Sequence, residues 1–315
     1  MFSRIFKVDF RSRRTLLVMI VACLFAVFFI AFRLSGSFEA TIITLVFGLC
    51  FGILWATTSI KTNTLLEAIE KIQAEDQKID REAKKEIIRK LENRIQKERK
   101  ITYNQLEAMQ SVYFEVKPSV PLPTMGGWAV SPDTALILID LIKRYQPKTV
   151  VDIGSGTSSI IAGYLLKDRA KDGVKVFSVD HSDEFAVKTR NQVKDHKLDQ
   201  IVSVYTAPLV DQKIKKQSYS WYDLKDVNLG KKKIDLLFVD GPPGATQQQS
   251  RYPALPILRD KMSDTAVIVV DDFDREDEKA MVDRWMKDNK EYSLETFRTE
   301  KGVAVLYRNK VGEQK

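Results

Sequence analysis

The chain has 315 residues, enough for one sizeable domain with extensions, and its 50 Lys and Arg against 42 Asp and Glu give a formal net charge of +8. No basic face interleaved with aromatic residues accompanies that charge, which argues against a nucleic acid as partner. Apolar residues dominate the first sixty positions, charged residues the next fifty, and an ordinary globular mixture the remainder. The sequence therefore predicts an anchor, a linker and one folded domain.

The N-terminal region predicts two membrane spans. Residues 16–32 carry no charge, and residues 38–57 form a second apolar run that is interrupted only by Glu39. Each run approaches the roughly 20 residues that are needed to cross a bilayer core. A cleaved signal peptide is the alternative for the first run, but no small-residue cleavage site follows it. We expect a tight hairpin of two transmembrane helices in contact with the lipid bilayer.

Basic residues predict the orientation of this hairpin. Five of them lie within residues 1–15, Lys61 follows the second run, and only Arg33 lies in the short connection. Because positive residues stay on the cytoplasmic side of a membrane, both ends of the hairpin are expected in the cytoplasm. The sequence therefore predicts a multi-pass protein of the inner (cytoplasmic) membrane, with a basic cytoplasmic N-terminus at residues 1–15 and the C-terminal domain in the cytoplasm.

Residues 62–110 predict a long charged helix without proline or glycine. A narrow stripe recurs along it at alternating steps of four and three, with apolar Leu65, Ile69, Ile72, Ile79 and Ala83 and with Asp76 at the position between Ile72 and Ile79. Such a stripe is typical of a coiled coil, whereas a single solvated helix with i,i+4 ion pairs is the alternative. We predict a coiled-coil stalk that spaces the C-terminal domain from the membrane and joins copies into a homo-oligomer.

Residues 118–310 have the pattern of a folded α/β domain. A loop rich in proline and glycine ends in Trp128, and a helix is expected from Ser131 and Pro132 to about Tyr145. Seven strands are predicted, at 148–153, 174–179, 201–205, 234–239, 265–270, 292–298 and 302–307. Most early strands are unbroken runs of Val, Ile and Phe, as in parallel strands that are buried on both faces. The predicted fold is a doubly wound, mostly parallel, seven-stranded Rossmann-like sheet.

The stretch VVDIGSGTSS, residues 150–159, predicts a ligand-binding turn between the first strand and the next helix. Such a turn lies at the carboxyl end of a parallel strand, where ligands bind. A dinucleotide fingerprint has a small glycine where Ser159 stands, so the GxG signal is weak and NAD stays possible. Asp180 ends the next strand, 26 residues after Gly154. Its carboxylate can accept hydrogen bonds from ribose hydroxyls of NAD or S-adenosylmethionine, or it can simply cap the following helix.

Three carboxylates are predicted to meet beside this turn. Asp240 ends one strand, and Asp271 and Asp272 end the next. Acids this close repel one another unless a cation or protons intervene, and oxygen-only ligands favour a hard divalent ion such as Mg²⁺. The sequence therefore predicts a metal site at Asp240, Asp271 and Asp272, with turn or helix capping as the alternative.

Seven motifs lie in order between Trp128 and Arg308. They are GGWAVSPDTALIL, VVDIGSGTSSIIAGYL, VFSVDHSDEF, WYDL, IDLLFVDGPPG, RYPALPIL and AVIVVDDFDR. With a final antiparallel strand pair, this part of the chain resembles class I S-adenosylmethionine-dependent methyltransferases, in the branch related to catechol O-methyltransferases. The resemblance does not cover the two spans or the stalk. It implies an enzyme that transfers a methyl group from S-adenosylmethionine to a hydroxyl.

The resemblance implies roles for the residues of the glycine turn and of the next strand end. The residues that would shape the pocket for the methionine part of the cofactor are Asp152, Gly154, Gly156, Thr157 and Ser158. Asp180 would hold the ribose, and His181 would lie beside the adenine or the sugar. Asp240, Asp271 and Asp272 match the metal ligands of the catechol-type enzymes. Those enzymes carry an asparagine where Asp272 stands and a catalytic lysine where Pro243 stands, so the chain departs from them at both positions.

Methyl transfer requires an acceptor oxygen in line with the methyl group and a base for its proton. A metal would lower the pKa of a bound hydroxyl and orient it. Without a metal, the catalytic base is Asp240 or Asp271, or His181 if it points inward. Arg251 and Tyr252 are expected to recognise a polar acceptor, and Trp128 to stack on a sugar or another ring. The alternatives are a surface ion pair for Arg251 and packing for Trp128.

The sequence thus predicts a membrane-anchored O-methyltransferase. Its anchor favours an acceptor hydroxyl at the membrane, on a cell-surface glycan or a lipid-linked sugar intermediate. One alternative is an enzyme on a similar sheet that depends on NAD or a nucleotide sugar, which Ser159 and the three late acids argue against. The other is a catalytically inactive membrane scaffold with a coiled coil, which the intact glycine turn argues against.

Overall fold

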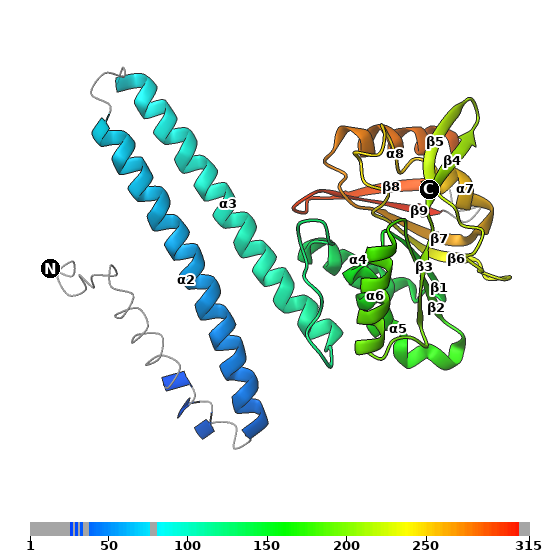
Figure 1. Cartoon of the computed structure of the whole chain (residues 1–315), viewed down its shortest axis with the longest axis horizontal. Coiled ribbons are helices and arrows are strands. Elements are labelled where there is room, and N and C mark those ends of the chain that lie inside the picture. The colour runs from blue at the N-terminus through cyan, green and yellow to red at the C-terminus, as the bar shows by residue number, and fades with distance from the viewer. Residues whose placement is uncertain (1–25, 28, 31, 34–37, 76–80, 309–315) are drawn as a thin grey trace. The chain divides into compact units, whose positions relative to one another are not determined.

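The computed structural model describes residues 26–27, 29–30, 32–33, 38–75 and 81–308 (Figure 1). The chain divides into two compact units, Met1–Leu91 and Glu92–Lys315. The predicted basic N-terminus at 1–15 and most of the predicted span at 16–32 lie outside the described residues. In the part of the chain that is described, no helix is both long enough and apolar enough to span a membrane.

The first unit contains helix α2 (Phe38–Glu75), which includes the second predicted span. Several large apolar side chains of α2 are more than half exposed, namely Val46, Phe47, Phe51, Ile53 and Trp55. At 3.6 residues per turn these positions are distributed around the helix instead of forming one stripe. Helix α2 therefore exposes apolar side chains in several directions.

The predicted stalk is helical on both sides of residues 76–80, which lie outside the described residues. Helix α2 ends at Glu75, and helix α3 (Arg81–Val116) follows. Helix α3 continues past the predicted stalk end at residue 110, and its buried Val112 and Val116 belong to the core of the second unit. The folded domain thus begins earlier than the predicted boundary at residue 118. The coiled-coil pairing stays a prediction.

A seven-stranded sheet forms the centre of the second unit, in the order β3-β2-β1-β6-β7-β9-β8. Its strands are β1 (Thr149–Ile153), β2 (Lys175–Asp180), β3 (Val202–Thr206), β6 (Ile234–Val239), β7 (Met262–Val270), β8 (Tyr292–Phe297) and β9 (Val303–Arg308). The first five are parallel, and β9 pairs antiparallel with both β7 and β8. All seven predicted strands are confirmed, with ends that differ by at most three residues. The predicted α/β fold with a mostly parallel Rossmann-like sheet is correct.

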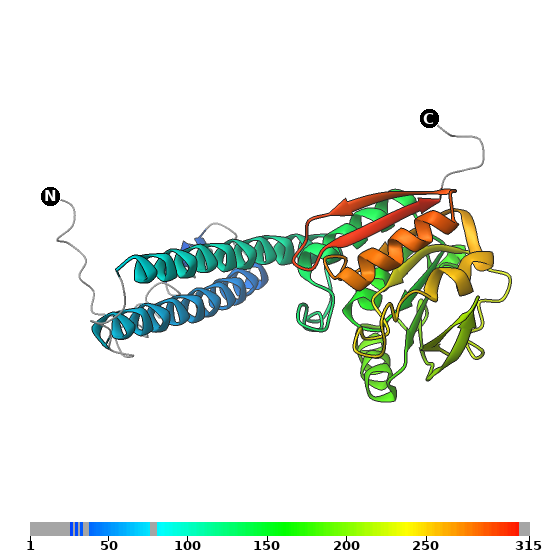
Figure 2. The same ribbon diagram turned by 90° about the horizontal axis from the view of Figure 1, so that it is seen from above.

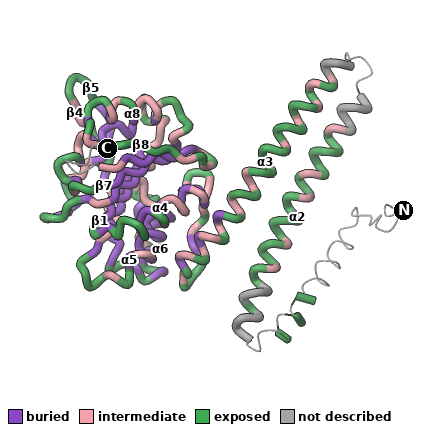
Figure 3. The backbone as a smooth tube through the Cα atoms, turned by 180° about the vertical axis from the view of Figure 1, so that it is seen from behind, coloured by how far each residue is buried: buried purple, intermediate pink, exposed green. Residues whose placement is uncertain are grey.

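Helices cover both faces of this sheet (Figure 2). One face carries α4 (Pro132–Tyr145), α5 (Thr157–Leu166) and α6 (Asp183–Asp195), and the other carries α7 (Ala254–Leu258) and α8 (Glu276–Asp288). Two short 3-10 helices, η1 (Lys167–Asp172) and η2 (Arg259–Lys261), complete the unit. Successive strand residues enter opposite cores, so that Val150 packs on the first face and Val151 on the second. Figure 3 shows the buried strands between the two layers, which explains their unbroken apolar runs.

A two-stranded hairpin of β4 (Leu209–Ile214) and β5 (Gln217–Tyr222) was not predicted from the sequence. Its first strand contains the consecutive polar residues Asp211, Gln212 and Lys213, and its turn contains Lys215 at a φ of 55°. That left-handed conformation is usually signalled by glycine or asparagine, neither of which stands there. The hairpin is functionally relevant because it carries the buried aromatic residues Trp221 and Tyr222 into the second core.

Candidate active site

The glycine turn lies where the sheet changes direction, because β1 is flanked by β2 on one side and by β6 on the other. Gly154 adopts a φ of +110°, and a Cβ at this position would lie 3.0 Å from the backbone carbonyl carbon of Asp240. Its N–H donates to the Val179 carbonyl at 2.9 Å, and the Asp240 N–H donates to Ile153 at 2.8 Å. Only glycine combines this conformation with so close an approach. The turn is thereby held at a topological switch point, where α/β sheets bind ligands.

Helix α5 begins directly after this turn, at Thr157, with Gly156 as its N-cap residue. Among the described residues, no side chain caps the N-terminus of α5. The first N–H groups of a helix have no partner within the helix, and they attract a negatively charged group. Thr157 instead uses its hydroxyl to donate to the Thr124 carbonyl at 3.1 Å, which fixes the proline-rich loop beside the turn. The expected cofactor residues Gly154, Gly156 and Thr157 are thus brought together.

Asp152, near the end of β1, is hydrogen-bonded to the first turn of α5, which follows the glycine turn. Its buried Oδ2 accepts hydrogen bonds from the hydroxyls of Ser158, at 2.7 Å, and Ser159. Burial raises the pKa of Asp152 to about 7, although the two serine hydroxyls act to lower it. Ser159 also lies 2.7 Å from the Ser178 hydroxyl of β2. The serine that replaces a third glycine therefore connects the first turn of α5 to two strands.

The raised pKa of Asp152 predicts a pH dependence of stability. The pKa of Asp152 is about 7 in the folded chain, above its value of about 3.8 in the unfolded chain. The contribution of Asp152 to the free energy of unfolding is therefore complete below pH 3.8 and is lost as the pH rises through 7. The melting temperature of the cofactor-free chain should fall between pH 5 and 8, and less steeply in Asp152→Asn. Burial lowers the pKa of His196, which acts in the opposite direction. Thermal denaturation over this range checks the difference, with the exposed Asp172→Asn as control; equal slopes in all three proteins would contradict it.

Asp180 ends β2 beside the glycine turn. Its Oδ2 accepts from the Ser155 hydroxyl at 2.9 Å, and its Oδ1 accepts from the Ser182 N–H at 2.9 Å. Nδ1 of His181 is 3.4 Å from the same Oδ1. The helix-capping alternative does not hold for Asp180 itself, because Ser182 is the residue that caps α6. Ser155 was not predicted, and it aligns the Asp180 carboxylate with the turn.

Tyr222 is a further site residue that the sequence analysis did not single out. Its ring meets His181 edge to face, with 6.1 Å between ring centroids. A Cβ on Gly241 would lie only 2.1 Å from the Tyr222 hydroxyl, so glycine is required there. Burial, and secondly the charge of Asp180, raises the pKa of Tyr222 well above its usual value. Tyr222 thus stays a neutral hydroxyl between the ends of β2 and β6.

The three predicted carboxylates gather at the ends of β6 and β7, as expected. The Asp271 N–H donates to the Val239 carbonyl at 3.1 Å, which joins the two strand ends. Asp272 takes a left-handed φ of 60°, a conformation that Asp and Asn tolerate better than most residues. Oδ1 of Asp271 accepts from the Thr134 hydroxyl of α4 at 3.3 Å, whereas its buried Oδ2 has no partner in the described structure. Burial raises the pKa of both Asp240 and Asp271.

Arg251 lies inside this acidic cluster. Its Nη2 is 2.8 Å from Oδ2 of Asp272 and 3.2 Å from Oδ1 of Asp240. Within the described residues, no group of three or more His, Cys, Asp or Glu side chains is arranged to hold a metal ion. The donor set therefore does not fit the predicted Mg²⁺, because a guanidinium already contacts two of its three carboxylates. The metal prediction for Asp240, Asp271 and Asp272 is corrected accordingly.

The sequence of the second unit was compared with known proteins. Residues 151–273 match the family model of a methyltransferase domain. Residues 151–273 of the second unit are therefore similar to a methyltransferase domain. A comparison with curated proteins found no match. The matched region extends from β1 to just beyond Asp272, and so it contains the glycine turn and all three carboxylates.

Solved structures with a similar arrangement include three bacterial methyltransferases. An O-methyltransferase from Bacillus cereus, in complex with SAH, is 16% identical, covers 64% of this chain and 91% of that chain, and has a TM-score of 0.44. TomG from Streptomyces achromogenes, an O-methyltransferase involved in tomaymycin synthesis, was solved in complex with SAM. It is 15% identical, covers 65% of this chain and 89% of that chain, and has a TM-score of 0.45. A methyltransferase from Geobacter sulfurreducens is 17% identical, covers 65% of this chain and 89% of that chain, and has a TM-score of 0.41. The similarity to a methyltransferase domain rests on the match over residues 151–273.

Two predicted acceptor residues of the methyltransferase domain are placed elsewhere than expected. Arg251 is only 3% exposed, and all of its nitrogens face acceptors within the protein. Tyr252 is buried in the second core, where it stacks on Tyr219 at 5.3 Å and lies under the guanidinium of Arg284 at 3.7 Å. Neither side chain is therefore available to a substrate, and both assignments are corrected.

Trp128, by contrast, is 88% exposed. Gly126 and Gly127 precede it at φ values of 87° and 65°, which form the turn that carries it. The ammonium group of Lys301, from the turn between β8 and β9, donates to the carbonyls of Gly127 at 2.6 Å and Ala129 at 3.2 Å. The positive charge of Lys301 also lowers the pKa of Asp240 and Asp271, against the larger effect of burial. The Trp128 loop therefore borders the acidic cluster.

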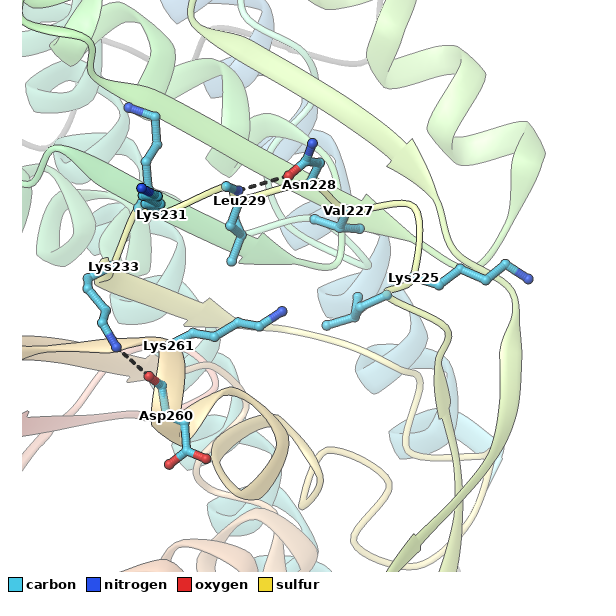
Figure 4. A pocket seen from close by; sticks show the side chains of 11 residues that line it. Lys225, Val227, Asn228, Leu229, Lys231, Lys233, Asp260 and Lys261 are labelled. Carbon is cyan, nitrogen blue, oxygen red and sulfur yellow. Dashed lines mark hydrogen bonds between the residues drawn. The ribbon is translucent and has the colours of Figure 1, made fainter.

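A separate cavity of about 600 Å³ lies at the opposite edge of the methyltransferase sheet. Lys233 precedes β6 and Lys261 precedes β7, so the cavity adjoins the amino ends of these strands. Figure 4 shows Lys225, Lys231, Lys233 and Lys261 around it, with the Lys233 ammonium bonded to the Asp260 carbonyl at 2.6 Å. It is basic and distant from the strand ends that carry the glycine turn, and so it is not the active site.

Proposed function

We propose that the chain is an S-adenosylmethionine-dependent O-methyltransferase. The observation that carries the proposal is the convergence of the glycine turn, Asp180 and Asp240 at one edge of a methyltransferase-domain sheet. The uncapped start of α5 suits the carboxylate of a methionine moiety. The Asp180 carboxylate suits the two hydroxyls of a ribose. The acidic residues lie on the other side of the turn, where an acceptor hydroxyl would be deprotonated.

Asp240 is the proposed base. Its side chain is 14% exposed, against 5% for Asp272, and Asp271 is fully buried. The methyl group of a sulfonium is already activated, so the carbon–sulfur bond breaks as the carbon–oxygen bond forms, and S-adenosylhomocysteine leaves. The acceptor proton passes to the Asp240 carboxylate. His181 contacts Asp180 and Tyr222, which favours a place beside the cofactor over a role as base.

Calorimetric titration of the full chain in detergent tests the cofactor. S-adenosylmethionine should bind with a stoichiometry of one, and NAD should not bind. Binding of NAD alone would favour the dehydrogenase alternative, and binding of neither would favour the inactive scaffold; either result overturns the proposal.

The domain is proposed to be anchored at the inner membrane by a hairpin of residues 16–32 and 38–57, with the domain in the cytoplasm. Support comes from the apolar sequence of both runs and from the exposed apolar side chains of α2. Apolar side chains that are exposed in several directions favour an apolar environment around the helix. Alkaline carbonate extraction of cells that express the full chain tests the anchor. Release of the protein into the soluble fraction would rule the anchor out.

The proposed acceptor is a hydroxyl of a cell-surface glycan or a lipid-linked sugar intermediate. The anchor would keep the domain near such molecules, and Trp128 offers an exposed ring on which a sugar can stack. Transfer of a labelled methyl group from S-adenosylmethionine to the membrane lipid and glycan fraction tests this assignment. Label that appears only in small soluble molecules would contradict it.

Replacement of Trp128 by alanine is expected to raise the KM for the membrane acceptor by about tenfold, or roughly 1.4 kcal/mol. Its exposed ring would be lost without any change in the core, so kcat and S-adenosylmethionine affinity should stay near their original values. Steady-state kinetics with the labelled membrane fraction measure the effect. Phe114→Ala, which removes another exposed aromatic ring of the same unit, is the matched control. An equal KM in the two variants would show that Trp128 does not contact the acceptor.

A further inference from the structure

Arg251 has the contacts of a buried counterion. Its Nη2 faces carboxylate oxygens of Asp272 and Asp240, at 2.8 Å and 3.2 Å. Its Nη1 donates to the Asp271 carbonyl at 3.1 Å, and its Nε lies 3.4 Å from the Pro242 carbonyl and 3.7 Å from Oε1 of Glu278. One guanidinium thus connects the ends of β6 and β7 with helix α8.

The acids around Arg251 require a cation. Four carboxylates belong to the cluster, those of Asp240, Asp271, Asp272 and Glu278. Buried acids in such proximity are stable together only when a positive charge or protons neutralise them. Arg275 supplies a second guanidinium, 2.9 Å from Oδ2 of Asp272, but its side chain is half exposed. Arg251 is therefore the internal cation of the cluster.

A divalent ion would need the space that Arg251 occupies. Mg²⁺ binds oxygen at about 2.0–2.1 Å and Ca²⁺ at about 2.3–2.6 Å. An ion that bridged Asp240 and Asp272 would use the same two oxygen atoms that Nη2 contacts. The metal ion and the guanidinium of Arg251 would then occupy nearly the same position, and their positive charges would repel each other. Guanidinium and metal ion exclude each other at this position.

The chain on both sides of Arg251 keeps the guanidinium in place. Ser250 is buried and its hydroxyl donates to the Pro242 carbonyl at 3.3 Å. Tyr252 is fixed in the second core, and its carbonyl accepts from the indole N–H of Trp285 at 2.9 Å. A metal ion could displace Arg251 only by pulling buried residues out of the core. Loss of the ion pairs and of this packing would oppose that displacement.

We infer that Arg251 takes the place of a divalent metal ion in this methyltransferase domain and orients Asp240 through its Oδ1 oxygen. The other carboxylate oxygen of Asp240 is then left for the acceptor proton. Arg251 is a positioning residue, because its contacts are with Asp240 and its neighbours and not with a substrate. The catalytic part of this inference rests on the proposed methyl transfer, whereas the exclusion of metal does not.

Binding of Mn²⁺ to the full chain, measured by the loss of the free-ion paramagnetic resonance signal, tests the inference without an acceptor. The unmodified protein should show no Mn²⁺ site that depends on Asp240. Arg251→Met should gain one such site, with at least about tenfold tighter binding than the unmodified protein, because the carboxylate oxygens of Asp240 and Asp272 are released. Arg251→Lys keeps a positive charge there and should not gain it. Methyl transfer by the unmodified protein should also persist in excess chelator.

Two outcomes would overturn the inference. One is a stoichiometric Mn²⁺ site in the unmodified protein that disappears in Asp240→Asn. The other is a folded Arg251→Met variant that binds Mn²⁺ no better than the unmodified protein. If Arg251→Met does not fold, Arg251→Met combined with Asp272→Asn removes one charge of each sign, and the measurement on the unmodified protein remains decisive. Failure of the proposed function is recognised separately, as absence of S-adenosylmethionine binding in calorimetry.

Discussion

Replacement of Asp240 by asparagine is expected to lower kcat for methyl transfer by about 10²–10⁴-fold, the usual contribution of a positioned general base. Asparagine has nearly the same shape, and its amide oxygen can still accept a hydrogen bond from Arg251 at the position of Oδ1. It cannot take the acceptor proton. The affinity for S-adenosylmethionine should change little, because the proposed cofactor site is the glycine turn and Asp180 and does not include Asp240. Single-turnover transfer of a labelled methyl group, together with calorimetric titration of the cofactor, separates the two effects.

Asp264→Asn is the control for this experiment. Asp264 is an exposed residue near the amino end of β7, far along the strand from Asp271 and Asp272. Its replacement should leave both kcat and cofactor affinity unchanged. A kcat of Asp240→Asn close to that of the unmodified protein would remove Asp240 as the base. His181→Gln would then be the next variant to measure, since His181 is a second candidate base and lies next to Asp180 and Tyr222.

The sheet could be predicted from the sequence because its strands are buried on both faces. Val150 and Val151 enter opposite cores, so the strand needs an apolar residue at every position and is visible as an unbroken run. The hairpin of β4 and β5 has no such pattern, since Asp211 and Gln212 are consecutive polar residues within β4. Its turn residue Lys215 carries no sequence signal for its left-handed backbone. Tertiary packing, and not local preference, determines that segment.

The same difference between local and tertiary information applies to the site. Gly154 and Asp240 each follow a strand directly and Asp180 ends one. The carboxyl ends of parallel strands lie at one edge, so the convergence of these residues follows from local pattern alone. Arg251 reaches its partners only because the chain after Pro242 folds back onto the ends of β6 and β7. No residue spacing in the sequence predicts that the chain after Pro242 folds back onto these strand ends. The cation of the acidic cluster was therefore expected correctly as a charge, but wrongly as a metal ion.

Replacement of Asp180 by asparagine is expected to weaken S-adenosylmethionine binding by about 30- to 1,000-fold, or roughly 2–4 kcal/mol, as two hydrogen bonds to a charged acceptor are lost or reduced. The carboxylate has two oxygens at the end of β2, and each already accepts from a loop group, Ser155 or Ser182. Asparagine can accept at only one of its two positions, so one of the two ribose hydroxyls loses its acceptor. Calorimetric titration of the full chain measures the change directly.

Asp172→Asn is the matched control, because Asp172 lies just before the amino end of β2 while Asp180 ends the same strand. Its side chain is exposed, and among the described residues its ion-pair partner is Arg169, at 3.5 Å. Cofactor affinity should be unchanged in this variant, and thermal denaturation should show that both variants are folded. If Asp180→Asn bound S-adenosylmethionine as tightly as Asp172→Asn, the ribose would have to lie elsewhere, and the carboxylate at the end of β2 would serve only to join Ser155 to Ser182. The glycine turn would then be the sole remaining anchor for the cofactor, and its open helix N-terminus would accept any small anion equally well.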